Sequence, residues 1–154
     1  MTVTQNQYIL QNAFHPAVCQ WFEKTFASPT PVQTAAWTEI VSQQRVLIAA
    51  PTGSGKTVMA LYMIAARRQP TLIIVHTKEL AFQWVEAIDQ FLGIEESEVG
   101  LIGAGKHTIG EKITVALVQS LYRCADEVYK GVGHLVVDEC HRAPSRTFTE
   151  AVTE

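Results

Sequence analysis

Eight consecutive residues, APTGSGKT at positions 50–57, combine two glycines with a lysine and a threonine. Their spacing fits the phosphate-loop pattern GxxxxGK followed by Ser or Thr, except that an alanine stands in place of the first glycine. Gly53 and Gly55 lie where a backbone that wraps a phosphate needs positive φ and no Cβ. The ammonium group of Lys56 can reach the β- and γ-phosphates, and the Thr57 hydroxyl can ligate Mg²⁺. The motif therefore predicts a site for a magnesium nucleoside triphosphate.

A second, acidic motif supplies the carboxylate that such a magnesium site requires. The stretch HLVVDECH covers positions 134–141, and its apolar residues 135–137 predict a buried strand. Asp138 follows at the end of this strand, where its carboxylate could hold Mg²⁺. Glu139 comes next, where it could orient or deprotonate the attacking water. We therefore predict that Lys56, Asp138 and Glu139 are the catalytic residues of a phosphate-transfer site.

The three cysteines of the chain and His141 do not form a metal-binding or disulfide pattern. Cys19, Cys124 and Cys140 are odd in number and widely spaced, and none belongs to a CxxC pair. Cys140 and His141 are adjacent on a turn, where two side chains rarely share one ion. The two acids that precede Cys140 would suppress its thiolate, which disfavours a nucleophilic cysteine. We interpret the cysteines as reduced thiols.

The elements that must position these motifs follow from the hydrophobic pattern. Short apolar runs alternate with longer segments of helical periodicity, which predicts an α/β fold with a mostly parallel sheet and helices on both faces. The predicted strands cover residues 45–50, 71–75, 99–102, 113–117 and 134–137. The predicted helices cover residues 16–27, 32–43, 56–68, 78–91 and 119–129. The phosphate loop would then join a strand to a helix, as its chemistry requires.

The composition is typical of one soluble domain. The chain has 154 residues, of which 47% are hydrophobic and 18% charged, and can bury a substantial core. Its apolar runs are far shorter than the roughly 18 residues that a membrane span needs. The first ten residues lack the pattern of a secretory signal, so we expect a cytoplasmic protein. The net charge of −3 neither requires nor excludes a polyanionic partner.

The phosphate loop and DECH together resemble motifs I and II of superfamily 2 helicases, the DEAD/DEAH-like family, and the likeness covers most of the chain. TPVQ at 30–33 resembles the Q motif of that family, which implies that Gln33 reads adenine. A glutamine amide offers one donor and one acceptor, as the N6 and N7 edge of adenine requires. The resemblance implies a RecA-like P-loop domain that uses ATP and Mg²⁺, with Thr57 and Asp138 on the metal. The nucleotide-binding residues that it implies are Gln33, Pro51, Thr52, Gly53, Ser54, Gly55, Lys56 and Thr57.

Three further segments resemble the motifs with which this family contacts a nucleic-acid strand. HTKELAFQW at 76–84 resembles motif Ia, and Thr77 and Lys78 would stand at a helix start, where free amides and a cation can bind a backbone phosphate. GAGK at 103–106 and VALVQSL at 115–121 resemble later motifs. The alternative for each is an ordinary turn or helix cap. The nucleic-acid contacts implied are Thr77, Lys78, Gly105, Lys106 and Gln119.

Among the other histidine and tryptophan residues considered, the resemblance implies a role for His141 only. By the same resemblance His141, the last residue of motif II, couples the nucleotide site to other motifs and to a second lobe; the alternative is a capping histidine. We interpret His76, Trp37 and Trp84 as packed or surface groups without chemistry, because isolated residues of these types in periodic segments usually have that role.

The same resemblance bears on the nucleic acid and on the extent of the domain. The opening of the chain is similar to Lhr-type helicases, whereas the phosphate-loop helix and DECHRAPSRTF are similar to DNA repair helicases and restriction-enzyme motors. Both favour DNA over RNA, although a grip on backbone phosphates does not distinguish the two without a reader of the 2′-hydroxyl. RNA therefore stays open as an alternative.

The chain stops shortly after His141, before any second RecA-like lobe, which in this family supplies arginine fingers. We therefore expect residues 1–154 to be one truncated N-terminal domain, with a helical Q-motif region at 1–43 and a P-loop core at 44–154. Such a lobe would bind nucleotide and nucleic acid but hydrolyse ATP poorly. The alternative from another class is a non-hydrolysing module that binds nucleotide or nucleic acid.

Overall fold

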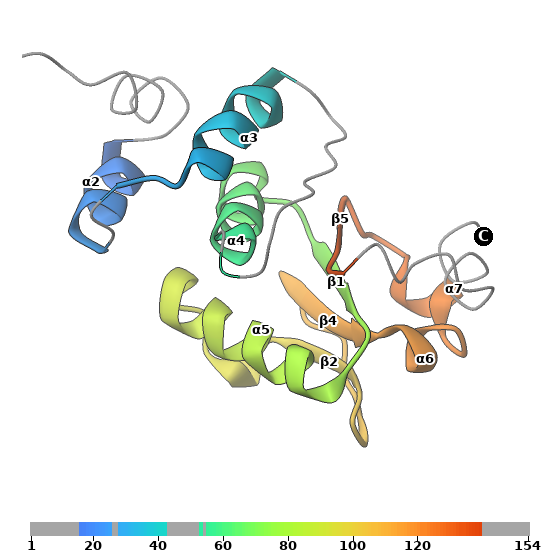
Figure 1. The fold of residues 1–154 in the computed structure, drawn as a ribbon. Helices are drawn as coiled ribbons and strands as arrows, with labels where there is room; N and C mark the ends of the chain where they lie inside the picture. Colours follow the sequence, from blue (N-terminus) through green and yellow to red (C-terminus); the bar gives the residue numbers. More distant parts are fainter. Residues whose placement is uncertain (1–15, 26–27, 43–52, 54, 140–154) are drawn as a thin grey trace, which may run out of the picture. The chain divides into compact units, whose positions relative to one another are not determined.

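The structure is a computed structural model, and it describes residues 16–25, 28–42, 53 and 55–139. The chain divides into two compact units, residues 1–66 and residues 67–154, and each is described by itself. Figure 1 labels the elements of both. The predicted strand at 45–50 and the predicted subdivision at residues 43 and 44 lie outside the described residues. None of the described helices is long and apolar enough to cross a membrane.

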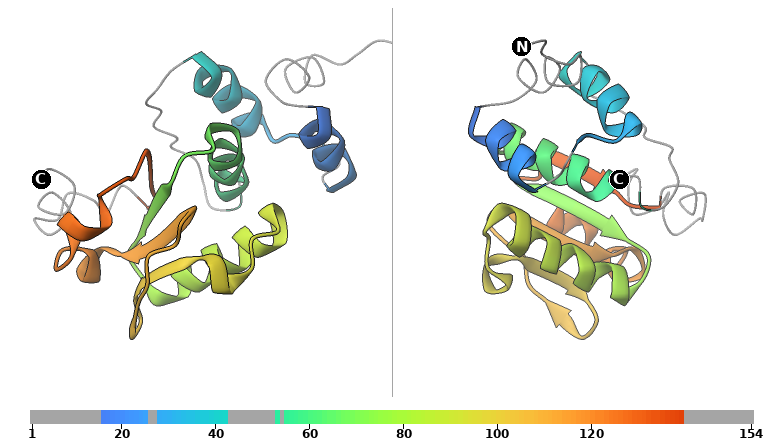
Figure 2. Two further views of the ribbon diagram at one scale, coloured as in Figure 1. Left: turned by 180° about the vertical axis from the view of Figure 1, so that it is seen from behind. Right: turned by 60° about the vertical axis from the view of Figure 1, so that its left-hand side comes forward.

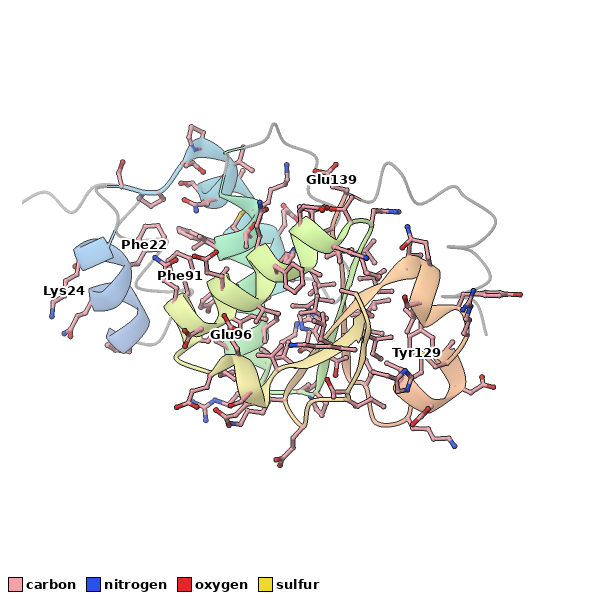
Figure 3. The ribbon with its side chains drawn as sticks, turned by 90° about the horizontal axis from the view of Figure 1, so that it is seen from below. Phe22, Lys24, Phe91, Glu96, Tyr129 and Glu139 are labelled. Atoms are coloured by element: carbon pink, nitrogen blue, oxygen red, sulfur yellow. The ribbon has the colours of Figure 1, made fainter. Side chains whose placement is uncertain are left out.

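Three helices lie among the described residues of the first unit. They are α2 (Pro16–Thr25), α3 (Pro31–Ser42) and α4 (Lys56–Arg67). Proline stands at the first position of α2 and of α3, where its missing N–H costs no intrahelical hydrogen bond. Phe22 of α2 and Trp37 of α3 pack edge to face, with ring centroids 5.3 Å apart and the planes at 83°; Phe22 is labelled in Figure 3. The three predicted helices are thus confirmed, with bounds that shift by one or two residues.

Among the described residues, the second unit has a five-stranded sheet in the order β3-β2-β4-β1-β5. Figure 2 shows its ribbon from two further sides. Its strands are β1 (Thr71–Val75), β2 (Gly100–Gly103), β3 (Lys106–His107), β4 (Ile113–Leu117) and β5 (His134–Val137). All neighbours pair in parallel except β3, which forms an antiparallel hairpin with β2. The predicted bounds of β1, β4 and β5 are confirmed. The strand predicted at 99–102 lies one residue later, and β3 was not predicted.

Both faces of the central strands are covered. Every residue of β1 and of β4 is buried, and successive side chains of a strand point to opposite faces. One face carries a cluster that includes Leu72 and Ile74 of β1 together with Leu121 and Val128 from two short helices. The longer helix α5 (Lys78–Leu92) packs against β1 and β4. This burial on both faces explains why the strands read as continuous apolar runs.

The helix predicted at 119–129 is wrong as a single element. The structure has two short helices there, α6 (Val118–Leu121) and α7 (Ala125–Val128). Cys124 precedes α7 with φ −142° and ψ 22°, which is not helical, and its N–H bonds to the carbonyl of Leu121 in a tighter turn. The break lets Leu121 and Val128 enter the same apolar cluster. Hydrophobic spacing alone did not reveal it.

The strand β5 is less buried than predicted. Leu135 is 38% exposed, and Val136 and Val137 are only partly buried. The reason is its place in the sheet, since among the described strands β5 pairs with β1 alone. His134, at the start of the strand, is instead buried, with 5% of its surface exposed. The prediction of a fully buried strand before Asp138 is therefore corrected.

Candidate nucleotide and nucleic-acid sites

The described part of the phosphate loop has the backbone that phosphate binding requires. Gly53 and Gly55 have φ of +82° and +86°, the left-handed region that favours glycine. Lys56 begins α4 and Thr57 follows it, and both side chains are partly buried. The free amides of the first turn of α4 add partial positive charge at the same place. The prediction of positive φ at both glycines is confirmed, whereas Pro51, Thr52 and Ser54 lie outside the described residues.

Gln33 is tied to the start of its own helix. The backbone N–H of Thr30 donates to Oε1 of Gln33 at 2.8 Å, and the N–H of Gln33 donates to Oγ1 of Thr30 at 3.2 Å. This reciprocal pair is a capping box, in which each side chain satisfies an otherwise unbonded amide. The Gln33 side chain is buried, and a Cβ on Gly55 would strike its Nε2 atom. Gln33 therefore supports the phosphate loop, and its adenine-reading role stays a prediction.

Asp138 leaves the end of β5 with its carboxylate held by two donors. The indole N–H of Trp84 donates to Oδ2 at 2.9 Å, and the backbone N–H of Glu139 donates to Oδ1 at 2.9 Å. The N–H of Asp138 itself continues the β5–β1 ladder by donating to the carbonyl of Ile74. An ionised carboxylate has about four lone-pair sites, so acceptor capacity remains after two bonds. Mg²⁺ prefers such oxygen ligands. The Asp138 carboxylate therefore keeps the acceptor capacity that one ligand of a magnesium ion needs.

Glu139 has an unusual backbone. Its φ is +56°, in the left-handed region that non-glycine residues seldom adopt. The side chain is partly buried and is labelled in Figure 3. Strained residues of this kind persist where the surrounding structure holds them, and they are frequent at functional sites. The observation motivates the predicted role of Glu139 beside the nucleotide. The remaining residues of the motif, Cys140 and His141, lie outside the described part of the chain.

The predicted nucleotide residues fall in two units. Lys56, Thr57 and Gln33 belong to the first unit, and Asp138 and Glu139 belong to the second. Within each unit the structure brings the expected residues together, since Gln33 adjoins Gly55 and Glu139 bonds to Asp138. The joint action of Lys56 with Asp138 stays a prediction.

Trp84 is the residue that sequence reasoning missed. We predicted no chemistry for it, yet its indole bonds to the carboxylate at the centre of the predicted metal site. Its side chain is only 4% exposed. A buried indole N–H usually finds an acceptor, so the sequence contained a general signal for a partner but no indication of which one.

Thr77, Lys78 and Gln119 gather at one edge of the sheet. Thr77 and Lys78 follow β1 and Gln119 follows β4, and these parallel strands end in register at Val75 and Leu117. The hydroxyl of Thr77 accepts from the N–H of Leu80 at 3.3 Å and so caps α5, which is the alternative that the sequence left open. Lys78 and Gln119 are exposed. Their roles in binding a strand stay predictions.

Gln119 also has a structural partner. Its Nε2 donates to the carbonyl of His76 at 3.1 Å, which joins the start of α6 to the segment between β1 and α5. The bond fixes the two strand ends against each other. Gln119 is exposed as a residue, and its amide oxygen stays a candidate for a nucleic-acid contact.

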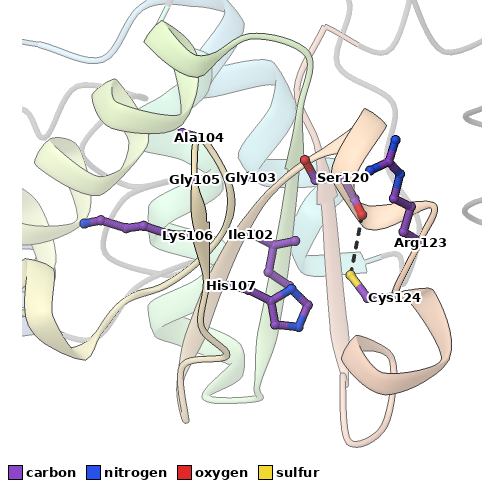
Figure 4. Close-up of a pocket in the computed structure, with 9 residues that line it drawn as sticks. All are labelled: Ile102, Gly103, Ala104, Gly105, Lys106, His107, Ser120, Arg123 and Cys124. Atoms are coloured by element: carbon purple, nitrogen blue, oxygen red, sulfur yellow. Dashed lines mark hydrogen bonds between the residues drawn. The ribbon is translucent and has the colours of Figure 1, made fainter.

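Gly105 and Lys106 lie at the hairpin between β2 and β3, beside a pocket of about 310 Å³ (Figure 4). Gly105 has φ +83°, and Lys106 is exposed. In Figure 4 the Lys106 side chain points away from Arg123, which approaches the pocket from the end of α6. The residues that line the pocket are Ile102, Gly103, Ala104, Gly105, Lys106, His107, Ser120, Arg123 and Cys124. Three of them are basic or can become so, which suits an anionic backbone.

Neither of the two described cysteines, Cys19 and Cys124, forms a disulfide. Burial, reinforced by the charge of Glu23, raises the pKa of the Cys19 thiol. Burial, reinforced by Glu127, raises the pKa of the Cys124 thiol, whose Sγ donates to the carbonyl of Ser120 at 3.5 Å. Both thiols are therefore neutral at physiological pH, as expected of structural cysteines.

A family model described as "Type III restriction enzyme, res subunit" matches residues 26–154. The chain belongs to this family.

Two curated relatives extend the family relationship. The "DNA 3'-5' translocase XPB2" of Sulfurisphaera tokodaii is 35% identical over 114 residues, which cover 74% of the chain and 24% of that protein. The "Lhr helicase/uracil glycosylase" of Escherichia coli is 42% identical over 52 residues, which cover 34% of the chain and 3% of that protein. The resemblance to superfamily 2 helicases of the DNA repair, Lhr and restriction types is thus confirmed. The chain spans about a quarter or less of the length of these relatives.

A solved structure identifies the fold. The yeast DEAD-box splicing factor Prp28 aligns with a TM-score of 0.75 at 24% identity, and the alignment covers 99% of the chain and 42% of that protein. At this identity the likeness establishes the fold alone. The restriction-family chain therefore has the predicted α/β RecA-like architecture.

Proposed function

We propose that this chain is the first motor lobe of an ATP-dependent DNA helicase or translocase. The observation that carries the proposal is the left-handed backbone of Gly53 and Gly55 directly before Lys56 and α4, in a chain of a helicase family. That backbone turns amide groups toward one point, and the helix N-terminus and a lysine add charge there. Few ligands other than a polyphosphate match this combination.

Each nucleotide-site residue has a distinct proposed role. Lys56 neutralises the β- and γ-phosphates, while Thr57 and Asp138 hold Mg²⁺. When bound, this ion neutralises charge on the phosphate oxygens. Glu139 orients the attacking water and accepts its proton. The hydrogen bonds to both oxygens of Asp138 support its part, because they direct the remaining lone pairs.

The nucleic-acid part of the proposal concerns the backbone of a strand. The exposed residues Lys78, Lys106 and Gln119 would contact phosphates, and the amides at the start of α5 after Thr77 would add to them. DNA is favoured because the XPB2 relative is named a DNA translocase. RNA is the second candidate, because a relative from Dictyostelium discoideum that is 30% identical over 139 residues is named a probable ATP-dependent RNA helicase.

The proposed motor cycle needs a second lobe. ATP would draw two RecA-like lobes together and hydrolysis would release them, so that γ-phosphate contacts become steps along the strand. His141 would relay between the nucleotide and that lobe. Residues 1–154 alone, taken as one N-terminal lobe, would bind nucleotide yet hydrolyse it poorly without an arginine finger. The alternative is a non-hydrolysing binding module.

The first test is a titration of the chain with fluorescent ADP, with and without Mg²⁺. Lys56→Ala should abolish binding, because it removes the phosphate charge. Lys24→Ala is the matched control, since it removes the same charge from an exposed position on α2 in the same unit (Figure 3). Equal binding by the Lys56 variant and the unaltered chain would remove the phosphate loop from the proposal.

The choice of nucleic acid is tested separately. Single-stranded DNA and RNA of one sequence should compete for the chain, with DNA the stronger competitor. Lys78→Ala and Lys106→Ala should weaken both and reduce the salt dependence of binding, as expected of phosphate contacts. Lys130→Ala, at an exposed position after α7, is the control. Stronger competition by RNA would transfer the proposal to an RNA helicase lobe.

A further inference from the structure

The bond between Trp84 and Asp138 joins two parts of the chain that are far apart in sequence. Trp84 lies on α5, whose buried residues Ala81, Val85 and Ile88 recur at helical spacing and anchor that face of the helix. Packing of α5 therefore holds the indole in place independently of its hydrogen bond to Asp138. The bond itself, at 2.9 Å from Nε1 to Oδ2, has a normal hydrogen-bond length and is partly buried.

The two donors on Asp138 are not equivalent. The N–H of Glu139 belongs to the next peptide, so this bond ties the carboxylate only to its own turn. The bond from Trp84 comes from another element and ties Oδ2 to the packed body of the second unit. Of these two bonds, the one from Trp84 can therefore set where the carboxylate points relative to the sheet.

Orientation matters because a carboxylate that holds Mg²⁺ must present a lone pair at one place. Partners that hydrogen-bond a ligating carboxylate orient it, and their loss commonly weakens metal binding by about 10-fold or more. After the bonds from Trp84 and from the Glu139 N–H, one lone pair of Oδ2 and one of Oδ1 remain available. A phenylalanine at this position would fill similar space but donate no hydrogen bond.

We propose that Trp84 is a positioning residue whose indole N–H holds the Asp138 carboxylate in the orientation that receives the divalent cation. The inference rests on the proposed metal role of Asp138. The competing interpretation is that the bond only satisfies a buried indole and stabilises the fold. The two differ in whether loss of the N–H alters metal affinity.

The test uses Mn²⁺, whose unpaired electrons broaden nearby NMR signals, with the Glu139 amide as the reporter beside Asp138. The titration is run on the full chain with and without ADP. In Trp84→Phe, the Mn²⁺ concentration that half-broadens this signal should rise about 10-fold. Trp37→Phe, which alters a buried tryptophan of the first unit, should leave it unchanged. An unchanged concentration in Trp84→Phe, or no broadening in the unaltered chain, overturns the proposal.

A second measurement needs no variant to fold. The indole N–H signal of Trp84 should shift when Mg²⁺ is added to the unaltered chain, because its acceptor oxygen belongs to the carboxylate that takes up the ion. The Trp37 indole signal should not move. A stationary Trp84 signal overturns the proposal as well. Metal-free ADP binding reports on Lys56 and the phosphate loop, so failure of the proposed function is distinguished from failure of this inference.

Discussion

Gly55 and Gln33 lie so close that a Cβ at position 55 would strike the Gln33 amide, which is locked to Thr30 by the capping box. The phosphate loop and the Q-motif helix are thus in direct contact within the first unit. Gly53 offers a natural comparison, since its φ is almost the same but, among the described residues, nothing lies within 4 Å of the Cβ that it could carry.

We expect Gly55→Ala to destabilise the chain more than Gly53→Ala. Both variants carry the strain of positive φ, of order 1–3 kcal/mol, but only the first adds the collision with Gln33. Urea unfolding measures the difference. Adding Gln33→Ala to Gly55→Ala should recover part of the loss. Equal destabilisation of the two single variants would show that the loop moves away from Gln33 without cost.

Gln33→Ala should weaken the preference for ATP over GTP if the amide reads adenine. The same change removes half of the capping box and should lower the free energy of unfolding by about 1 kcal/mol. Thr30→Ala removes the other half of the box and retains the amide. Competition binding with ATP and GTP separates the two effects. If Thr30→Ala alters the preference as much as Gln33→Ala does, the preference depends on the helix start and not on the glutamine.

Glu139→Gln should spare ATP binding and stop hydrolysis in a protein that includes the second lobe. Glu139→Gly should stop hydrolysis too, but it also removes the strain at φ +56°, so its free energy of unfolding should equal or exceed that of Glu139→Gln. Single-turnover hydrolysis and urea unfolding are the two measurements. Normal turnover in the glutamine variant would exclude Glu139 from the chemistry.

Lowering the pH should reduce the free energy of unfolding of the chain, because His134 is buried in its neutral form. Burial, reinforced by the charge of Arg67, lowers the pKa of His134 below its ordinary value of about 6.5. As the pH falls through that ordinary value, the unfolded chain takes up a proton that the folded chain does not, so the free energy of unfolding decreases until the lower folded pKa is reached. In the folded chain the neutral ring meets the Thr71 hydroxyl, with 3.4 Å between Nδ1 and Oγ1.

His134→Gln should therefore flatten the pH dependence of stability below about pH 6.5. His107→Gln is the control, because His107 is exposed and lies 3.6 Å from the carboxylate of Glu127. Thermal unfolding across pH 5 to 8 gives both profiles. An unchanged profile in His134→Gln would contradict the prediction. A flattened profile in His107→Gln would assign the pH dependence to His107 instead.

Local patterns predicted local structure well. The glycines of the phosphate loop were expected at positive φ because the motif itself requires that backbone, and both have it. The bounds of β1 and β4 were also predictable, because strands buried on both faces are continuous, mostly apolar runs.

Features that depend on distant partners were not predictable in the same way. The hairpin strand β3 has two exposed residues and no hydrophobic pattern. The exposure of Leu135 accompanies the position of β5 at the end of the order of the described strands, which the sequence alone does not reveal. The contact of Trp84 with Asp138 requires β5 to lie beside β1 and α5 to lie over the sheet. Helical periodicity indicated that Trp84 would be buried, but not which atom its indole would meet.

The fixed start of α5 has a consequence for how this segment tolerates changes of length. Thr77 caps the helix, and Trp84 stands about two turns further along it. One residue inserted between them would rotate the indole by about 100° around the helix axis and away from Asp138. Four inserted residues would return it to nearly the same side but displace it by about 6 Å along the axis. Insertions and deletions should therefore be excluded from this stretch, although each would preserve a well-formed amphipathic helix.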